Sequence, residues 1–265
     1  MAVKSPPFSW EALAKKYEPL TKGVGLDSKE IKELLYATLI LGVVLSSGNW
    51  GLVQFIVATF VVFFSYTLHH VSYKWHAKRY NAYTKYEFCW RFALLVFLIG
   101  IFSEARVIIP VVGGAAIMTP RLYRPGRAFP FLGPKERARI MAIGPLISVF
   151  LALFARALIG VFGNNLLLVD LFRFNVWLAA ISMLPLTMVY PSERFRKYLE
   201  AIIPTFPGAM ILFGDKSLYV FLLSFVFISL ALVNYVSILT SILIAIILAL
   251  LIWIEFFRRF KESIF

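Results

Sequence analysis

Six apolar stretches of roughly membrane length divide this 265-residue chain, and they restrict its fold more than any other feature. A transmembrane helix needs about 20 mainly apolar residues to cross a hydrocarbon core of about 30 Å. With 60% hydrophobic residues, the chain also carries more apolar surface than a soluble fold of this length buries. We therefore predict an α-helical polytopic membrane protein with about six transmembrane helices. The stretches are about Leu34–Leu45, Leu52–Leu68, Ile140–Phe162, Leu166–Val189, Leu218–Val233 and Val236–Ile254.

Basic residues predict which helix ends face the cytoplasm, because short connections rich in Lys and Arg stay on that side. The connections Ser46–Gly51, Gly163–Asn165 and Asn234–Tyr235 contain neither residue. Six crossings with both termini in the cytoplasm satisfy this pattern. We therefore expect a multi-pass protein of the cell membrane. We expect the net charge of +13 to serve topology and contact with anionic lipid headgroups, not nucleic-acid binding. Basic residues gather in the N-terminal arm, at Lys74–Arg91, at Arg121–Arg139, at Arg194–Lys197 and in the C-terminal tail.

The apolar segment 88–120 does not fit a simple crossing, because basic residues flank both of its ends. Arg91–Phe102 is long enough for a short helix, whereas Val107–Met118 is rich in β-branched residues and broken by Pro and Gly. Such a segment either crosses twice or dips in and returns. We expect a membrane-dipping strand or re-entrant element packed against the central helices, where protein shields its backbone. Glu104 and Arg106 are expected to pair with each other at the interface.

All three histidines, His69, His70 and His76, lie where an apolar stretch gives way to a basic one. A helical zinc site of the His-Glu-x-x-His type needs two His on one face and a Glu that polarises the metal-bound water. Here His70 stands in place of the Glu, and Tyr73 stands in place of the second His. His69 and His76 lie about 10 Å apart along a helix, too far to bind one zinc ion directly. We therefore predict no metal and no cofactor; the alternative is a distorted helix in which all three histidines bind zinc.

Four stretches, in order, resemble the site-two protease family of intramembrane zinc metalloproteases, especially its archaeal members. The run Leu68–Ala82 is similar to the family's active-site helix, and Val107–Ile117 is similar to its membrane-dipping Pro-Gly-Ala element. Ala142–Ser148 resembles the Ala-Gly-Pro-x-x-Asn helix start, and Asn175–Leu186 resembles the segment that leads to the family's Asp ligand. The resemblance implies a site-two-protease-like core of membrane helices over residues 67–194.

Departures from the family pattern fall on the residues that carry its chemistry. By this resemblance, His69 is a retained metal ligand and His70 replaces the catalytic Glu. Tyr73 replaces the second His ligand, and Tyr190 replaces the Asp ligand. The resemblance therefore implies a retained fold with a dead site. These vestigial positions are His69, His70, Tyr73 and Tyr190.

A protease-like body without its metal is still able to hold a transmembrane helix, so we predict a pseudoprotease that binds or scaffolds a transmembrane partner or a membrane complex. Small residues at Gly144, Ser148 and Ala152 recur every four positions, which favours close helix packing against a partner or inside the chain. Two alternatives stay open. One is an active intramembrane metalloprotease with an atypical site. The other is a transporter or channel element. Its candidate path-lining residues include Glu104 and the intramembrane Arg156, which lies one helical turn after Ala152.

The predicted organisation follows from these segments. The single cysteine, Cys89, excludes an internal disulfide and a cysteine metal cluster. We divide the chain into a cytoplasmic N-terminal arm (1–33), the first spans (34–66), the protease-like membrane core (67–194), an interfacial segment (195–216), a C-terminal helical hairpin (217–256) and a basic tail (257–265).

Overall fold

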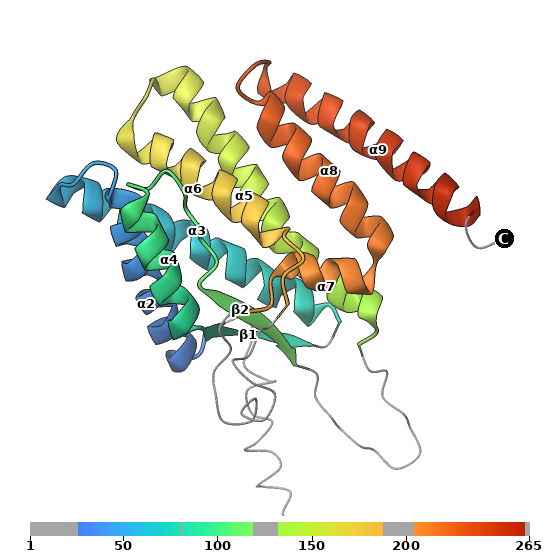
Figure 1. The fold of residues 1–265 in the computed structure, drawn as a ribbon, viewed down its shortest axis with the longest axis horizontal. Helices are drawn as coiled ribbons and strands as arrows, with labels where there is room; N and C mark the ends of the chain where they lie inside the picture. The colour runs from blue at the N-terminus through green and yellow to red at the C-terminus, as the bar shows by residue number, and fades with distance from the viewer. Residues whose placement is uncertain (1–25, 81, 119–131, 188–203, 263–265) are drawn as a thin grey trace, which may run out of the picture.

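The computed structural model describes residues 26–80, 82–118, 132–187 and 204–262, and these are mostly helical (Figure 1). Within these ranges, three helices are long and apolar enough to cross a membrane, at residues 52–78, 134–162 and 238–259. This agrees with the prediction of a helical membrane protein, while the count of six crossings stays a prediction. In chain order the elements are α2 (Ser28–Ser46), α3 (Leu52–Lys78), β1 (Tyr83–Phe88), α4 (Trp90–Phe102), β2 (Gly113–Met118), α5 (Pro134–Phe162), α6 (Leu166–Ser182), α7 (Pro207–Gly214), α8 (Lys216–Leu232) and α9 (Ile238–Glu262).

Several helices begin at residues that satisfy their first free backbone N–H groups. Asp27 caps α2 in a reciprocal arrangement with Glu30, the third residue of the helix. The side chain of Asn165 accepts a hydrogen bond at the start of α6, and that of Asp215 does the same for α8. Pro134 occupies the first turn of α5, where the missing N–H costs nothing. These local signals explain why the helix starts differ from the limits of the apolar stretches.

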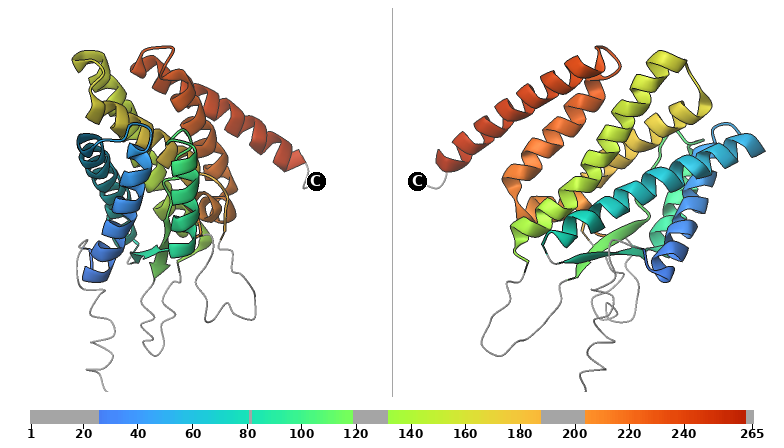
Figure 2. Two further views of the ribbon diagram at one scale, coloured as in Figure 1. Left: turned by 60° about the vertical axis from the view of Figure 1, so that its left-hand side comes forward. Right: turned by 180° about the vertical axis from the view of Figure 1, so that it is seen from behind.

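Helices α2, α5 and α6 pack against α3, which runs above the small β-sheet (Figure 1). One buried core joins α2, α3, α4 and α6, and a second joins α5, α6, α7 and α8. Helix α9 lies on the outside, against α8 (Figures 1 and 2). Its outer face exposes Leu243, Ile247, Leu251 and Ile254, as a lipid-facing surface would.

The sheet consists of β1 and β2, which pair antiparallel with Tyr83 opposite Met118 and Phe88 opposite Gly113. The outer edge of β1 is not open. The carboxylate of Glu30 accepts the N–H of Tyr86 at 3.0 Å, and that of Glu33 accepts the N–H of Phe88 at 3.1 Å. Side chains of α2 thus satisfy the N–H groups that β1 turns away from its partner strand.

The segment after β1 agrees with its predicted elements. The expected short helix is α4, and β2 forms the last six residues of the expected strand or re-entrant segment. Glu104 and Arg106 form the predicted ion pair, with 3.7 Å between a carboxylate oxygen and a guanidinium nitrogen, and both side chains are exposed. Whether residues 104–118 dip into a bilayer or cross it stays a prediction.

Element limits differ from the predicted division in several places. Helix α2 begins at Ser28, inside the predicted arm, because Asp27 caps it there. Helix α3 runs without interruption through the boundary between residues 66 and 67. Helix α6 ends at Ser182, earlier than the predicted apolar stretch. In the predicted interfacial segment 195–216 the described part contains α7, and residues 195–203 lie outside the described residues.

Candidate functional site

A buried chain of hydrogen bonds joins α3 to α5 at His69. The Tyr73 hydroxyl lies 2.7 Å from Nε2 of His69, and the Ser148 hydroxyl lies 2.9 Å from Nδ1 of the same ring. The Ser148 hydroxyl in turn donates to the Gly144 carbonyl at 3.3 Å. All three side chains are at most 3% exposed, so water does not compete for these bonds.

The network assigns the tautomer of His69. Because the proton of the Ser148 hydroxyl goes to the Gly144 carbonyl, its oxygen accepts the N–H at Nδ1 of His69. The bare Nε2 then accepts the proton of Tyr73. Each donor in this series of hydrogen bonds has an acceptor. The bonds point in one direction, which strengthens each of them. Neither nitrogen of His69 is left to bind a metal ion.

The helix geometry explains why Tyr73 takes this position. Residues four apart lie on one face of a helix, so the side chain of Tyr73 reaches the place that a second imidazole needs in a helical zinc site. Gly144 makes room for it, because a Cβ atom there would overlap the Tyr73 ring. In the described part of the chain, no three His, Cys, Asp or Glu side chains are placed to share an ion. The described residues around His69 therefore lack the set of donor groups that a zinc ion requires.

His70 lies in a different environment from its neighbour. Its side chain is buried and has no hydrogen-bond partner among the described residues, and its Nε2 is fully enclosed. Three tyrosine rings surround it, with centroids 4.8 Å away at Tyr66, 5.8 Å away at Tyr73 and 4.5 Å away at Tyr86. Burial raises the pKa of Tyr86 well above its ordinary value, so this hydroxyl stays neutral. His70 is therefore a buried imidazole without its normal hydrogen bonds.

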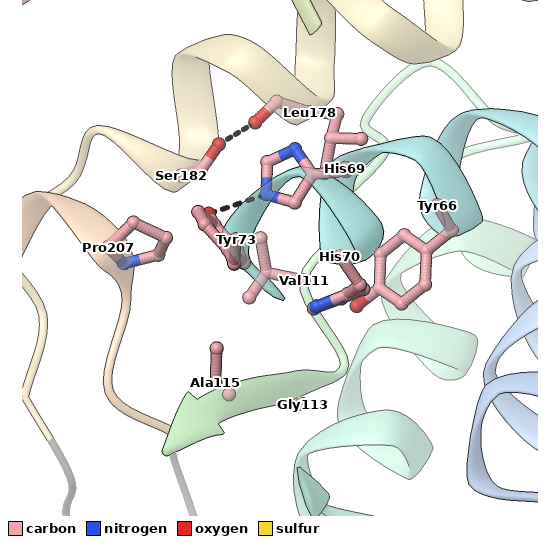
Figure 3. A pocket seen from close by; sticks show the side chains of 11 residues that line it. Tyr66, His69, His70, Tyr73, Val111, Gly113, Ala115, Leu178, Ser182 and Pro207 are labelled. Carbon is pink, nitrogen blue, oxygen red and sulfur yellow. Dashed lines mark hydrogen bonds between the residues drawn. The ribbon is translucent and has the colours of Figure 1, made fainter. Parts of the chain in front are cut away.

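A small cavity with room for about one water molecule lies beside His70. Figure 3 shows the His70 ring directed toward the space between Tyr73, Val111 and Ala115. Leu178 of α6 closes the cavity from the other side. The site thus combines apolar walls with a buried imidazole nitrogen that lacks a partner among the described residues.

The outer edge of β2 borders the same cavity. Alternate residues of a strand direct their N–H and C=O groups to opposite edges. Cys89 donates to the carbonyl of Val112, so the register places the backbone groups of Gly114 toward β1 and those of Gly113 and Ala115 toward the outer edge. Within the described ranges, these outward groups have no hydrogen-bond partner. Gly113 and Ala115 also line the cavity.

The remaining predicted positions do not converge on His69. His76 lies two turns further along α3, where its ring contacts Tyr80 at 5.7 Å between centroids. Ala152 is fully buried inside the chain, as are Gly144 and Ser148. Arg156 is partly exposed and forms no ion pair with a described residue. Tyr190 lies outside the described residues.

Two buried polar contacts were missed by the sequence analysis. Lys74 of α3 lies 2.5 Å from the carboxylate of Glu30 in α2. The amide of Asn175 in α6 donates to the hydroxyl of Ser65 in α3 at 2.8 Å. The capping pattern at Asp27 predicts the start of α2. No local pattern predicts a partner 44 or 110 positions away.

Comparison with known proteins gives a distant relative. The chain is 26% identical over 162 residues to "Putative zinc metalloprotease MJ0611" of Methanocaldococcus jannaschii, and the match covers 60% of this chain and 78% of that protein. No family model matches the sequence. No solved structure matches it. This likeness supports a relation to metalloproteases in general.

Replacing Tyr73 with phenylalanine tests the hydrogen-bond chain. The change removes one hydroxyl and leaves the buried Nε2 of His69 without a donor, so we expect the free energy of unfolding to fall by about 1–2 kcal/mol. Chemical unfolding in detergent micelles measures this loss. Tyr36→Phe is the matched control, because Tyr36 is 45% exposed. Equal effects of the two substitutions would show that the bond between Tyr73 and His69 contributes nothing.

Proposed function

We propose that this chain is a non-catalytic, site-two-protease-like protein of the cell membrane that binds an unwound segment of a transmembrane partner. In this proposal it crosses the membrane six times, with both termini in the cytoplasm. Two observations carry the proposal: Tyr73 fills the ligand position beside His69, and the outer edge of β2 has no hydrogen-bond partner among the described residues. In this proposal the chemistry is lost, and a strand edge that is able to pair with a peptide backbone is kept.

The donor set supports a loss of catalysis. Zinc hydrolysis needs bare imidazole nitrogens and a carboxylate that activates water. Both nitrogens of His69 are occupied by Tyr73 and Ser148, and His70 stands where the carboxylate is needed. The cavity lining contains no Asp or Glu. Among the described residues, the site therefore offers neither a set of metal ligands nor a general base.

Partner binding is supported by the strand edge. A segment that unwinds within a membrane must pair its freed N–H and C=O groups, because the hydrocarbon core offers no hydrogen bonds. Adding the segment as a strand beside β2 pairs them with the outward groups of Gly113 and Ala115. The apolar side chains of Val111 and Leu178 suit an apolar segment at this position.

Lipid headgroups are the second partner in this proposal. At the end of α3 the guanidinium of Arg79 lies 4.3 Å from the centroid of the Trp75 ring, and both side chains are exposed. Trp90, at the start of α4, is exposed as well. Exposed tryptophan beside basic residues is typical of a membrane–water interface. We therefore assign the end of α3 and the start of α4, which carry these residues, to the cytoplasmic headgroup region.

Proline substitutions in β2 test the binding site. Ala115→Pro removes an outward N–H and places a ring on the free edge, so we expect it to abolish binding of a transmembrane peptide of about 20 residues with a glycine-rich centre. Fluorescence anisotropy of the labelled peptide in micelles measures the affinity. We expect the thermal stability of this variant to stay close to that of the unchanged protein.

Ala116→Pro is the matched control, because it breaks a hydrogen bond between β1 and β2 and should lower the melting temperature. Unchanged peptide affinity in Ala115→Pro contradicts the proposed site. Cross-linking of this edge to a second copy of the chain would contradict a transmembrane partner as its occupant.

An active metalloprotease is the second candidate, favoured by the likeness to the Methanocaldococcus jannaschii protein, which is named as a zinc metalloprotease. It requires the helix around His69 to rearrange so that Tyr73 releases the imidazole. Chelator-sensitive cleavage of a membrane-embedded peptide by the purified protein would establish this candidate and exclude the first.

A further inference from the structure

We propose that His70 selects a serine in the bound segment, at the residue that enters the cavity beside β2. This inference rests on the proposed function and names the chemistry that the site recognises. The selecting atom is a ring nitrogen of His70. The feature selected is a small side chain with a hydroxyl group.

The first argument is the missing hydrogen bond. Neutral imidazole offers one N–H donor and one bare nitrogen acceptor, and both are normally paired when the ring is buried. His70 is 6% exposed, and no hydrogen bond links it to any residue that the structure describes. Leaving such a group unpaired costs about as much as one good hydrogen bond contributes. A ligand that supplies this hydrogen bond therefore binds more tightly than one that does not.

The second argument is the size of the cavity beside the ring. It has room for about one water molecule, so it admits a hydroxyl group but excludes a branched or aromatic side chain. Figure 3 shows that Tyr73 and Ala115 confine this space from opposite sides. A serine of a strand paired with β2 is short enough to place its Oγ there. Alanine fits by size but cannot supply the hydrogen bond.

The third argument is the contrast with His69, the adjacent residue on the same helix. Both nitrogens of His69 are engaged within the chain, by Tyr73 and by Ser148. Only His70, of these two neighbours, has capacity left for a partner.

The test uses three transmembrane peptides that differ at one central residue, which is serine, alanine or leucine. We expect the serine peptide to bind the full-length protein about tenfold more tightly than the alanine peptide, and the leucine peptide to bind most weakly. In His70→Phe we expect the preference for serine over alanine to disappear. In His70→Asn, which keeps a donor and an acceptor, we expect part of the preference to return. The ratio of the two Kd values reports selection and is independent of a general loss of stability.

A spectroscopic measurement on the unchanged protein covers the case in which His70→Phe does not fold. In protein labelled with ¹⁵N-histidine, we expect the serine peptide to shift the ring nitrogen signals of His70, while those of His69 stay in place. Unmoved His70 signals would overturn the inference.

The outcomes separate this inference from the proposed function. Equal Kd values for the serine and alanine peptides, with binding still lost in Ala115→Pro, would overturn the role of His70 and leave the strand-edge site standing. Failure of all three peptides to bind would overturn the proposed function and this inference with it.

Discussion

Replacing Lys74 with methionine is expected to lower the free energy of unfolding by about 3–5 kcal/mol. The carboxylate of Glu30, which is 2% exposed, would remain buried without its positive partner. Its remaining partners are the backbone N–H groups of Asp27 and Tyr86, which do not neutralise its charge. Chemical unfolding in detergent micelles measures the loss. Because Glu30 links α2, α3 and β1, we expect the three elements to loosen together.

Lys29→Met is the matched control for this prediction. Lys29 also pairs with a glutamate of α2, but its side chain is 68% exposed and its nitrogen lies 3.6 Å from the Glu33 carboxylate. An exposed pair of this kind contributes at most about 1 kcal/mol. The double variant Glu30→Gln with Lys74→Met removes both charges and should recover part of the loss. Equal effects of the two lysine substitutions would contradict the structural role of the buried pair.

Gly144→Ala is expected to lower the free energy of unfolding by about 2–3 kcal/mol, the second large effect. The added Cβ atom would overlap the ring of Tyr73, which is fully buried and would have to shift. Tyr73 must then move away from His69 and weaken the bond to its Nε2. Unfolding measurements, together with the ring ¹⁵N signals of His69, follow both consequences.

Gly160→Ala provides a control in the same helix. Gly160 lies near the end of α5, and a Cβ atom there meets no other atom within 4 Å. Alanine favours a helix over glycine by about 0.5–1 kcal/mol, so this variant should be slightly more stable than the unchanged protein. A loss in Gly160→Ala as large as that in Gly144→Ala would contradict close packing against Tyr73 as the cause.

The helical class could be predicted from the sequence because apolar stretches of membrane length leave few alternatives. The short helix α4, the strand β2 and the pair of Glu104 and Arg106 also followed from local composition. Each of these features depends on residues close together in the chain. Helix limits were less accurate, since capping at residues such as Asp27 is not visible in hydropathy.

The site was predictable only in part. The spacing of His69 and Tyr73 predicts that both lie on one helix face, and the structure brings them within hydrogen-bond distance. The contact with Ser148 depends on the packing of α3 against α5, which no local pattern defines. The unpaired His70 and the open edge of β2 emerge only when helices and sheet are assembled. Sequence patterns identified the residues, and tertiary packing determined which of them have partners.

Zinc content tests the central claim most directly. Mass spectrometry of the purified protein, prepared without chelator, measures zinc per chain. We predict much less than one zinc ion per chain, with no change in His69→Ala, because Tyr73 and Ser148 already occupy both nitrogens of His69. About one zinc ion per chain, lost in His69→Ala, would contradict a site held together by hydrogen bonds and would restore the metalloprotease reading.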